Sequence, residues 1–132
     1  MGIEVLPQVL ANGDALTQVF INLFSNAEDS IAASGGSNAH FIRIRGMYRD
    51  DSQRVDLFLT DSGNDISAEA ESQLFTPFVS TKKAGEGTGL GLAITSGLMG
   101  KMGGSVRFER GKNGRKNFCL TLPAAPGKVE KA

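Results

Sequence analysis

The sequence has few of the residues that build disulfides or metal sites. Cys119 is its one cysteine and His40 its one histidine. An internal disulfide and a metal site made of several histidines are therefore both excluded. The residues around Cys119 (Asn-Phe-Cys-Leu-Thr-Leu) are typical of a half-buried strand, so we expect a small core residue in a reducing compartment.

Long apolar runs and an excess of one charge are also missing. No run of about eighteen apolar residues occurs, and the N-terminus lacks a signal-peptide pattern. Fourteen basic residues balance fourteen acidic ones, so we expect neither nucleic acid nor membrane contact, and a cytoplasmic domain. Five basic residues of the C-terminal third predict a solvated strand-and-turn surface: Arg107, Arg110, Lys112, Arg115 and Lys116.

The length and the apolar spacing predict one domain over residues 1–132. Apolar residues three and four apart predict helices over 15–33 and 90–102, and a short helix over 67–74 begins at Ser67. Alternation predicts an extended entry and four further strands, over residues 3–9, 41–47, 55–60, 105–109 and 117–122. We therefore expect a two-layer α/β sandwich: a mixed, mostly antiparallel sheet covered on one face by helices, with a flexible tail over 123–132.

Glycine is present in excess, at 17 of 132 residues against about 7% in average proteins. Eight of these glycines lie between Gly85 and Gly104, within and after a polar loop over residues 76–91. Glycines at alternate positions let backbone N–H groups approach an anion, and the start of the next helix favours negative charge. A flexible surface loop has the same composition, so this segment alone leaves both interpretations open.

Polar residues also recur at places where a ligand site and plain exposure are both possible. Asn22, Asn26 and Asp29 share one face of the helix predicted over 15–33. Buried amides need hydrogen-bond partners, so this face indicates either a ligand site or contact with solvent. Asp61 follows the strand predicted over 55–60, where it is either a turn former or a carboxylate presented to a ligand.

Taken together, these segments resemble the nucleotide-binding boxes of the Bergerat-fold ATPases, the GHKL superfamily of histidine kinases, gyrase B subunits, mismatch-repair ATPases and heat-shock chaperones. Residues 18–29 resemble the N box, Asp61-Ser-Gly63 the G1 box, residues 74–82 the F box of histidine kinases, and residues 85–92 the G2 box. The resemblance covers roughly residues 11–122. It implies the catalytic and ATP-binding domain of a two-component sensor histidine kinase, with residues 76–91 as the ATP lid.

The resemblance also implies the cofactors, ATP and Mg²⁺, and the roles of single residues. Asn26 would hold Mg²⁺ with support from Asn22, Asp61 would accept a hydrogen bond from the adenine amino group, and Gly63 would keep the adenine pocket flat. Lys82 would be a countercharge, Thr88 and its neighbours would form the lid, and Phe75 and Phe78 would anchor the lid or contact a partner helix. Asn22 and Lys82 are the candidate catalytic residues. The candidate nucleotide-binding residues are Asn22, Asn26, Asp29, Asp61, Gly63, Asp65, Ile66, Phe75, Lys82, Gly87, Thr88, Gly89, Leu90 and Gly91.

Asn22 separates kinases from hydrolases within the superfamily. The hydrolases and anti-sigma-factor kinases of this fold carry a glutamate there, which activates a water or a serine hydroxyl. An amide cannot accept that proton, but a neutral imidazole is already nucleophilic, so positioning and charge neutralisation do most of the catalysis. This favours transfer of the ATP γ-phosphoryl to a histidine on a separate dimerisation domain of the same kinase, which then serves a response regulator. Whether the parent kinase is anchored in a membrane stays open.

Two features depart from the family's pattern. The G1 box normally reads Asp-x-Gly-x-Gly, and Asp65 replaces the last glycine with a carboxylate that would repel phosphates and crowd the turn. His40 lies in an alternating strand pattern, so we expect the phosphoacceptor histidine on another domain. The alternative function is a nucleotide-impaired interaction module that keeps the fold and docks onto a helix bundle.

Overall fold

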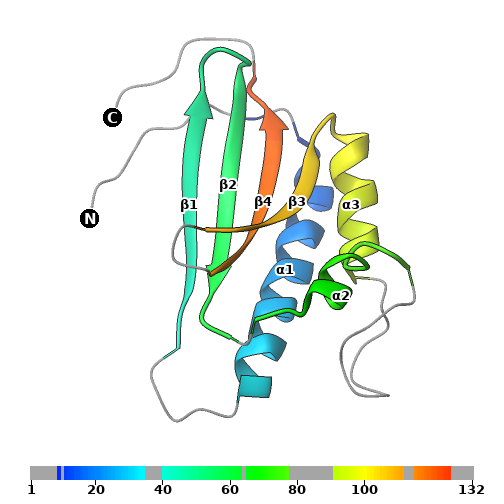
Figure 1. The fold of residues 1–132 in the computed structure, drawn as a ribbon. Helices are drawn as coiled ribbons and strands as arrows, with labels where there is room; N and C mark the ends of the chain where they lie inside the picture. The colour runs from blue at the N-terminus through cyan, green and yellow to red at the C-terminus, as the bar shows by residue number, and fades with distance from the viewer. Residues whose placement is uncertain are drawn as a thin grey trace.

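A four-stranded antiparallel sheet and the helices on one of its faces make up the described fold (Figure 1). The computed structural model describes residues 9, 11–34, 40–63, 65–77, 91–111 and 115–125. Within these ranges the strand order is β1-β2-β4-β3, with every neighbouring pair antiparallel. The strands are β1 (Ile42–Arg49), β2 (Arg54–Asp61), β3 (Ser105–Arg110) and β4 (Lys116–Pro123). The predicted two-layer α/β sandwich is confirmed.

The helices are α1 (Gly13–Ser34), α2 (Ala68–Glu71) and α3 (Gly91–Lys101). The side chain of Asn12 caps α1, because its Oδ1 accepts from the backbone N–H of Ala15 at 3.1 Å, as the sequence predicts. Two glycines end α3: Gly103 has a φ of +74°, and the N–H of Gly104 donates to the Met99 carbonyl at 2.9 Å. The two long helices, α1 and α3, lie side by side on the same face of the sheet.

The core lies between these two helices and the sheet. Alternate residues of β2 and β4 point toward the helices. The side of the sheet that they form, which we call the helix face, is apolar along most of its length. The fully or almost fully buried members of the core are Val19, Leu23, Ala27, Leu59, Met99, Phe118, Leu120 and Leu122. Each buried aliphatic side chain contributes roughly 1.5–3 kcal/mol. This packing holds the polar flank of α1 close to the ends of β2 and β4.

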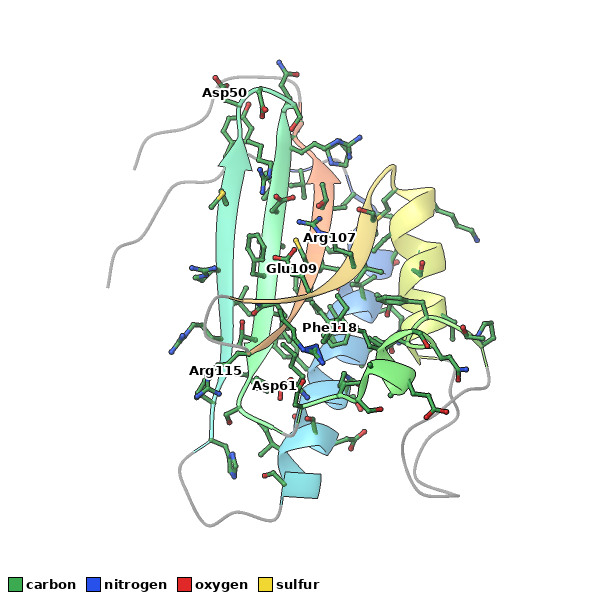
Figure 2. The ribbon with its side chains drawn as sticks, viewed as in Figure 1. Asp50, Asp61, Arg107, Glu109, Arg115 and Phe118 are labelled. Atoms are coloured by element: carbon green, nitrogen blue, oxygen red, sulfur yellow. The ribbon has the colours of Figure 1, made fainter. Side chains whose placement is uncertain are left out.

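The opposite face of the sheet, which we call the outer face, carries a polar network instead, to which Arg107 belongs (labelled in Figure 2). Asp56 of β2 accepts from the Thr121 hydroxyl at 2.7 Å and from the guanidinium of Arg49. Arg107 also donates to the Thr121 hydroxyl at 3.2 Å. Cys119 is fully buried beside this network, and burial raises the pKa of its thiol to about 11. It is therefore the inert core residue that the sequence predicts.

Two predicted elements differ from those observed. The helix predicted over 67–74 is helical only over Ala68–Glu71 and continues as turns, with the N–H of Gln73 donating to the Ala70 carbonyl at 3.1 Å. The predicted entry strand lies outside the described residues apart from Val9, which pairs with Ala124 in an isolated bridge. The later part of the predicted tail also lies outside them. No helix of the described ranges is long and apolar enough to cross a membrane.

Candidate functional site

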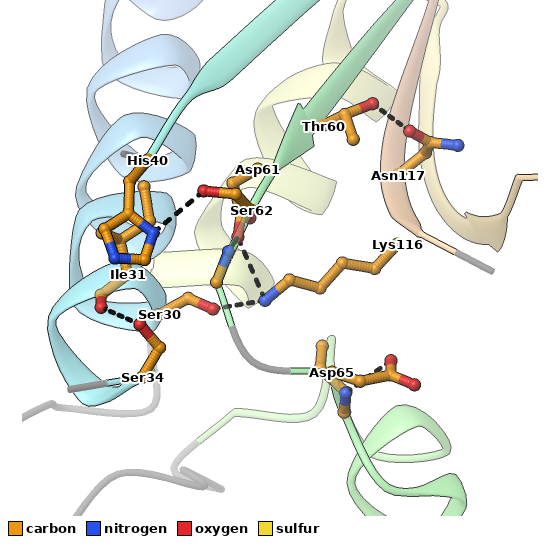
Figure 3. A network of polar contacts seen from close by, with 12 residues as sticks. Ser30, Ile31, Ser34, His40, Thr60, Asp61, Ser62, Asp65, Lys116 and Asn117 are labelled. Carbon is orange, nitrogen blue, oxygen red and sulfur yellow. Dashed lines mark hydrogen bonds and ion pairs between the residues drawn. The ribbon is translucent and has the colours of Figure 1, made fainter. Parts of the chain in front are cut away.

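A buried ion pair lies where β2 and β4 meet α1 (Figure 3). Asp61 ends β2, and its Oδ1 accepts from the backbone N–H of Gly63 at 2.8 Å. The Nζ of Lys116, the first residue of β4, lies 3.4 Å from the same oxygen and donates to the Ser30 hydroxyl of α1. The two charged side chains are only 2% and 4% exposed. Within the described residues no hydrogen bond or ion pair reaches the second oxygen of Asp61, Oδ2.

Gly63 lies so close to α1 that no larger residue fits. A Cβ at this position would lie 2.3 Å from the Ser30 Oγ, 2.6 Å from the Ser30 carbonyl carbon and 2.8 Å from the Asp61 Oδ1. Part of this obstruction is backbone, which cannot rotate away. The contact between α1 and the end of β2 therefore requires glycine. The predicted role of Gly63 beneath an adenine ring stays a prediction.

Asn22 joins α1 to the first turn of α3. Its Nδ2 donates to the Gly91 carbonyl at 3.2 Å and to the Thr95 hydroxyl at 3.3 Å. Gln18 in turn donates to the Asn22 Oδ1 at 2.8 Å. The structure thus brings together two predicted site residues, Asn22 and Gly91, that are 69 positions apart. The predicted catalytic role of Asn22 stays a prediction, and its amide joins α1 to the first turn of α3.

Asn26 and Asp29 lie on the stretch of α1 between Asn22 and Ser30, and both are half-buried. Within the described residues the amide of Asn26 makes no hydrogen bond, so its oxygen is available to a ligand. A neutral amide oxygen is a suitable Mg²⁺ ligand where nucleotide phosphates and waters complete the shell. The described ranges hold no group of three or more His, Cys, Asp or Glu that would bind a metal alone. Asn26 therefore fits Mg²⁺ held jointly with a nucleotide.

Asp65 points away from the buried ion pair and toward β3. Its carboxylate is 63% exposed, accepts from the backbone N–H of Ile66 at 2.7 Å and lies 3.3 Å from the guanidinium of Arg110. Arg110 also contacts Glu71 at 2.9 Å and the Ile66 carbonyl at 2.7 Å. Among the described non-glycine residues only Gln53 has a positive φ, so the backbone of Asp65 is unstrained. At Asp65 itself, the backbone strain suggested by the missing glycine is not observed.

Of the remaining predicted residues, Phe75 contacts the core, and the lid residues lie outside the part of the chain that the structure describes. Phe75 packs edge-on against Phe118, with ring centroids 6.4 Å apart, which places it as an anchor at the edge of the core. Its predicted contact with a nucleotide stays a prediction. The predicted lid residues lie outside the described residues: Phe78, Lys82, Gly87, Thr88, Gly89 and Leu90.

Lys116 is the main residue that the sequence interpretation missed. The sequence predicts a solvated residue of a basic surface, and the structure corrects this, because Lys116 is buried against Asp61 and Ser30. The signal was present in the alternation of β4. Lys116 shares its parity with Phe118, Leu120 and Leu122, so it belongs to the helix face. We nevertheless predicted an exposed residue, because Lys116 is one of five basic residues in the C-terminal third of the sequence.

Known proteins of one family are similar to this chain in sequence and in fold. Residues 11–126 match the family described as histidine kinase-, DNA gyrase B- and HSP90-like ATPases. The sensor histidine kinase ZraS of Escherichia coli is 34% identical over 91% of this chain, and the sensory histidine kinase/phosphatase NtrB of Rhodobacter capsulatus is 38% identical over 92%. The structure of full-length ShkA in complex with AMPPNP superposes with a TM-score of 0.77 at 28% identity, over 98% of this chain and 26% of ShkA.

These matches define the family of the chain. It belongs to the histidine kinase-, DNA gyrase B- and HSP90-like ATPases, as an ATP-binding domain of the histidine-kinase type. The chain spans 24% of the length of ZraS and 35% of NtrB. In such sensor kinases a domain like this one accompanies other domains of the same protein.

Proposed function

We propose that this domain binds Mg²⁺-ATP and transfers the γ-phosphoryl to a histidine on the dimerisation domain of the same cytoplasmic kinase module. That histidine would then serve a response regulator. The observation that carries the proposal is the buried carboxylate of Asp61, whose Oδ2 is left for a ligand by the described residues. A buried acceptor of this kind suits an exocyclic amine, which adenine provides.

The asparagines of α1 supply the phosphate end of the proposed site. Asn26 would hold Mg²⁺ through its amide oxygen, and the metal would neutralise charge on the phosphates. Asn22 would keep α3 in place through Gly91 and Thr95, so that the helix start faces the phosphates. None of these side chains is a strong base, which agrees with transfer to an imidazole that is already nucleophilic.

The test is a calorimetric titration of the chain with ATP, with and without Mg²⁺. Asp61→Asn should weaken ATP by about 1–3 kcal/mol, the scale of a hydrogen bond to a charged group. Asp56→Asn is the matched control, because Asp56 is buried in the same strand on the outer face. ATP affinity that is unchanged in Asp61→Asn, or equally reduced in both variants, would contradict the proposed role of Asp61.

Transfer is tested separately with labelled ATP. The chain alone should acquire no acid-labile label, because its one histidine, His40, lies just before β1 in contact with Ser62 and is not part of a helix. Addition of a dimerisation domain should give label on that partner. Label on His40 of the chain alone would contradict the proposed division between acceptor and catalytic domains.

The second candidate is the nucleotide-impaired interaction module. The observation that favours it is the ammonium of Lys116, which already pairs with the carboxylate proposed to bind adenine. It predicts binding to the dimerisation domain with no measurable heat from ATP. A chain that binds Mg²⁺-ATP would exclude this candidate.

A further inference from the structure

The outer face of β1, an edge strand of the described sheet (Figure 1), carries exposed arginines. The strand register pairs Met47 with Asp56, which belongs to the outer face. Because alternate residues of a strand share a face, Arg43 and Arg45 lie on this face too. All three side chains of β1 are exposed, that of Met47 to 47%. We call Arg43, Arg45 and Met47 the arginine row.

Aromatic rings hold the guanidinium groups of the row. The Cζ of Arg45 lies 5.5 Å from the ring centre of Phe58, its partner in register on β2. The Cζ of Arg43 lies 4.9 Å from the ring centre of Phe41, and Arg115 contacts the same ring at 5.0 Å. A guanidinium over a ring is attracted to its face, while its planar N–H donors stay available to an acceptor. Both arginines of the row are therefore partly ordered before a partner binds.

Neither arginine of the row has an ion-pair partner among the described residues. Asp56 and Glu109 are the carboxylates that β2 and β3 place on the outer face, and both pair with other arginines. Asp56 pairs with Arg49, and Glu109 pairs with Arg107 at 3.4 Å. The row therefore presents positive charge that the described part of the chain does not neutralise, and it suits an anionic partner.

The spacing of the row matches that of an acidic helix. Neighbouring members of the row are two residues apart in a strand, so their Cα atoms are about 6.8 Å apart. Residues four apart in an α-helix are separated by about 6 Å along its axis. Carboxylates at positions i and i+4 can thus each accept from one arginine, with an apolar side chain at i+8 against Met47. A helix packs on the face of a sheet, whereas an extended segment pairs at its edge.

The chain itself does not supply such a helix. None of α1, α2 and α3 has two carboxylates four residues apart. Outside the described residues the acidic residues are Glu4, Glu86 and Glu130, which are far apart in sequence. Single-stranded nucleic acid binds through bases stacked on aromatic rings, but arginines lie over the rings of Phe41 and Phe58. The formal net charge of zero also gives a polyanion no overall attraction.

We propose that the arginine row is a docking surface for a helix of a partner protein that carries acidic side chains at positions i and i+4 and an apolar one at i+8. Each guanidinium donates to one carboxylate, and Met47 contacts the apolar side chain. The row lies on the outer face and Asp61 on the helix face, so docking and nucleotide binding use opposite sides of the sheet. The inference therefore does not rest on the proposed function.

The experiment measures binding of two fluorescein-labelled, alanine-rich peptides to the 132-residue chain by anisotropy at low salt. Each peptide has about twenty residues, which is long enough to form a helix in water. The first has glutamates at i and i+4 and leucine at i+8. The second has the same composition with the glutamates at i and i+2, on different sides of the helix. The first should bind about tenfold more tightly than the second, and the difference should shrink at about 0.5 M salt.

Arg45→Gln should weaken binding of the first peptide about fivefold, because it removes one of the two charged contacts. Lys101→Gln is the matched control, since Lys101 is exposed at the end of α3 and its loss also removes one positive charge. This control should leave the affinity unchanged. A thermal melt checks that Arg45→Gln folds, and if it does not, the two peptides on the wild-type chain still decide.

Four outcomes would overturn the inference. The first peptide could fail to bind, or both peptides could bind equally, in which case spacing would play no part. An equal loss in Arg45→Gln and Lys101→Gln would mean that total charge alone accounts for binding. Tighter binding of single-stranded oligothymidine, or of vesicles of equal phosphatidylserine and phosphatidylcholine, with loss in Arg45→Gln would assign the row to a nucleic acid or a membrane. A dimer in ultracentrifugation that Arg45→Gln abolishes would assign it to a second copy of the chain.

Discussion

Asp56 and Asp61 belong to the same strand, β2, and are both buried, at 1% and 3% exposure. They point to opposite faces of the sheet. Asp56 has both carboxylate oxygens occupied, Oδ1 by the Thr121 hydroxyl and Oδ2 by the Arg49 guanidinium. Asp61 receives its contacts on Oδ1 alone, as far as the described residues show. A buried carboxylate with all acceptors satisfied stabilises a fold, whereas one with an acceptor left over has capacity for a ligand.

The two carboxylates also differ in the partners that neutralise them. Arg49 is 48% exposed and reaches Asp56 from the edge of the sheet. Burial alone would raise the pKa of Asp56, but the hydrogen bonds from Arg49 and Thr121 outweigh it and hold this pKa below its ordinary value. Lys116, by contrast, is buried as deeply as Asp61. Removing one member of that pair leaves the other without a partner and without water, so the pair is structurally coupled to the site.

The largest loss of stability is expected from a substitution beside Asp61, at Gly63. Gly63→Ala places a methyl group against Ser30 and Asp61, with contacts of 2.3–2.8 Å that force α1 away from β2. We expect about 3 kcal/mol loss of unfolding free energy, the upper range for overpacking, measured by urea denaturation. The matched control is Gly97→Ala in α3, where no atom lies within 4 Å of the added carbon. That control should gain about 0.5–1 kcal/mol from helix propensity. Equal stability of the two variants would refute the close contact at Gly63.

The second largest loss of stability is expected when the charge of Asp56 is removed. Asp56→Asn removes the charged partner of Arg49, so we expect unfolding free energy at neutral pH to fall by about 2 kcal/mol. Because the folded pKa of Asp56 is lowered, its contribution is present above the unfolded pKa and disappears as pH falls through the folded pKa. The difference between wild type and variant should therefore shrink in acid. The measurement is urea denaturation at several pH values.

Asp50→Asn, in the exposed turn before β2, is the control for this titration and should change stability by less than about 0.5 kcal/mol. ATP affinity should be the same in Asp56→Asn as in the wild type. A loss of ATP affinity there as large as in Asp61→Asn would mean that the two faces of β2 are not independent. A stability difference that grows in acid would contradict the lowered pKa.

Local patterns predicted most of the fold. The Asn12 cap, the period of α1 and the glycines after α3 each act over one or two turns of chain, so the predicted helices match the observed ones to within about two residues. The helix predicted over 67–74 was too long, because only its first turn has both a cap at Ser67 and continuous helical hydrogen bonds. For this helix the local signals specified the beginning, at Ser67, but not the end.

The site was predicted less completely, for a physical reason. Its contacts join distant parts of the chain, such as Asn22 to Gly91 and Lys116 to Ser30. The resemblance to a family placed Asn22, Asp61 and Gly91 in one site, but it assigned no role to a lysine at the start of the last strand. Extending the alternation of β4 by one residue would have put Lys116 on the helix face, but we expected it to be exposed, because a charged residue at a strand end usually is. Only the position of Asp61 on the adjoining strand explains why this one is buried.

The smallest expected effect concerns Asp65, the residue that replaces the family's glycine. Its carboxylate is largely exposed and pairs with Arg110, which itself is shared with Glu71 and the Ile66 carbonyl. The charge that would oppose ATP phosphates is therefore both hydrated and partly neutralised. Asp65→Gly should tighten ATP by no more than about 1 kcal/mol, and since the backbone is unstrained, relief of strain should add nothing.

Comparison of ATP with adenosine separates the possible causes of such a gain. Electrostatic repulsion acts only on the phosphates, so adenosine affinity should not change in Asp65→Gly, and the gain for ATP should shrink in 1 M salt, where the Debye length is about 3 Å. Glu69→Gln, an exposed carboxylate in the first turn of α2, is the control for a general loss of negative charge and should leave both affinities unchanged. Equal tightening of adenosine and ATP would show that the side chain obstructs the base. Weaker ATP binding would show instead that the Asp65–Arg110 pair supports the site, because Arg110 holds the Ile66 carbonyl and α2 in place through the same guanidinium.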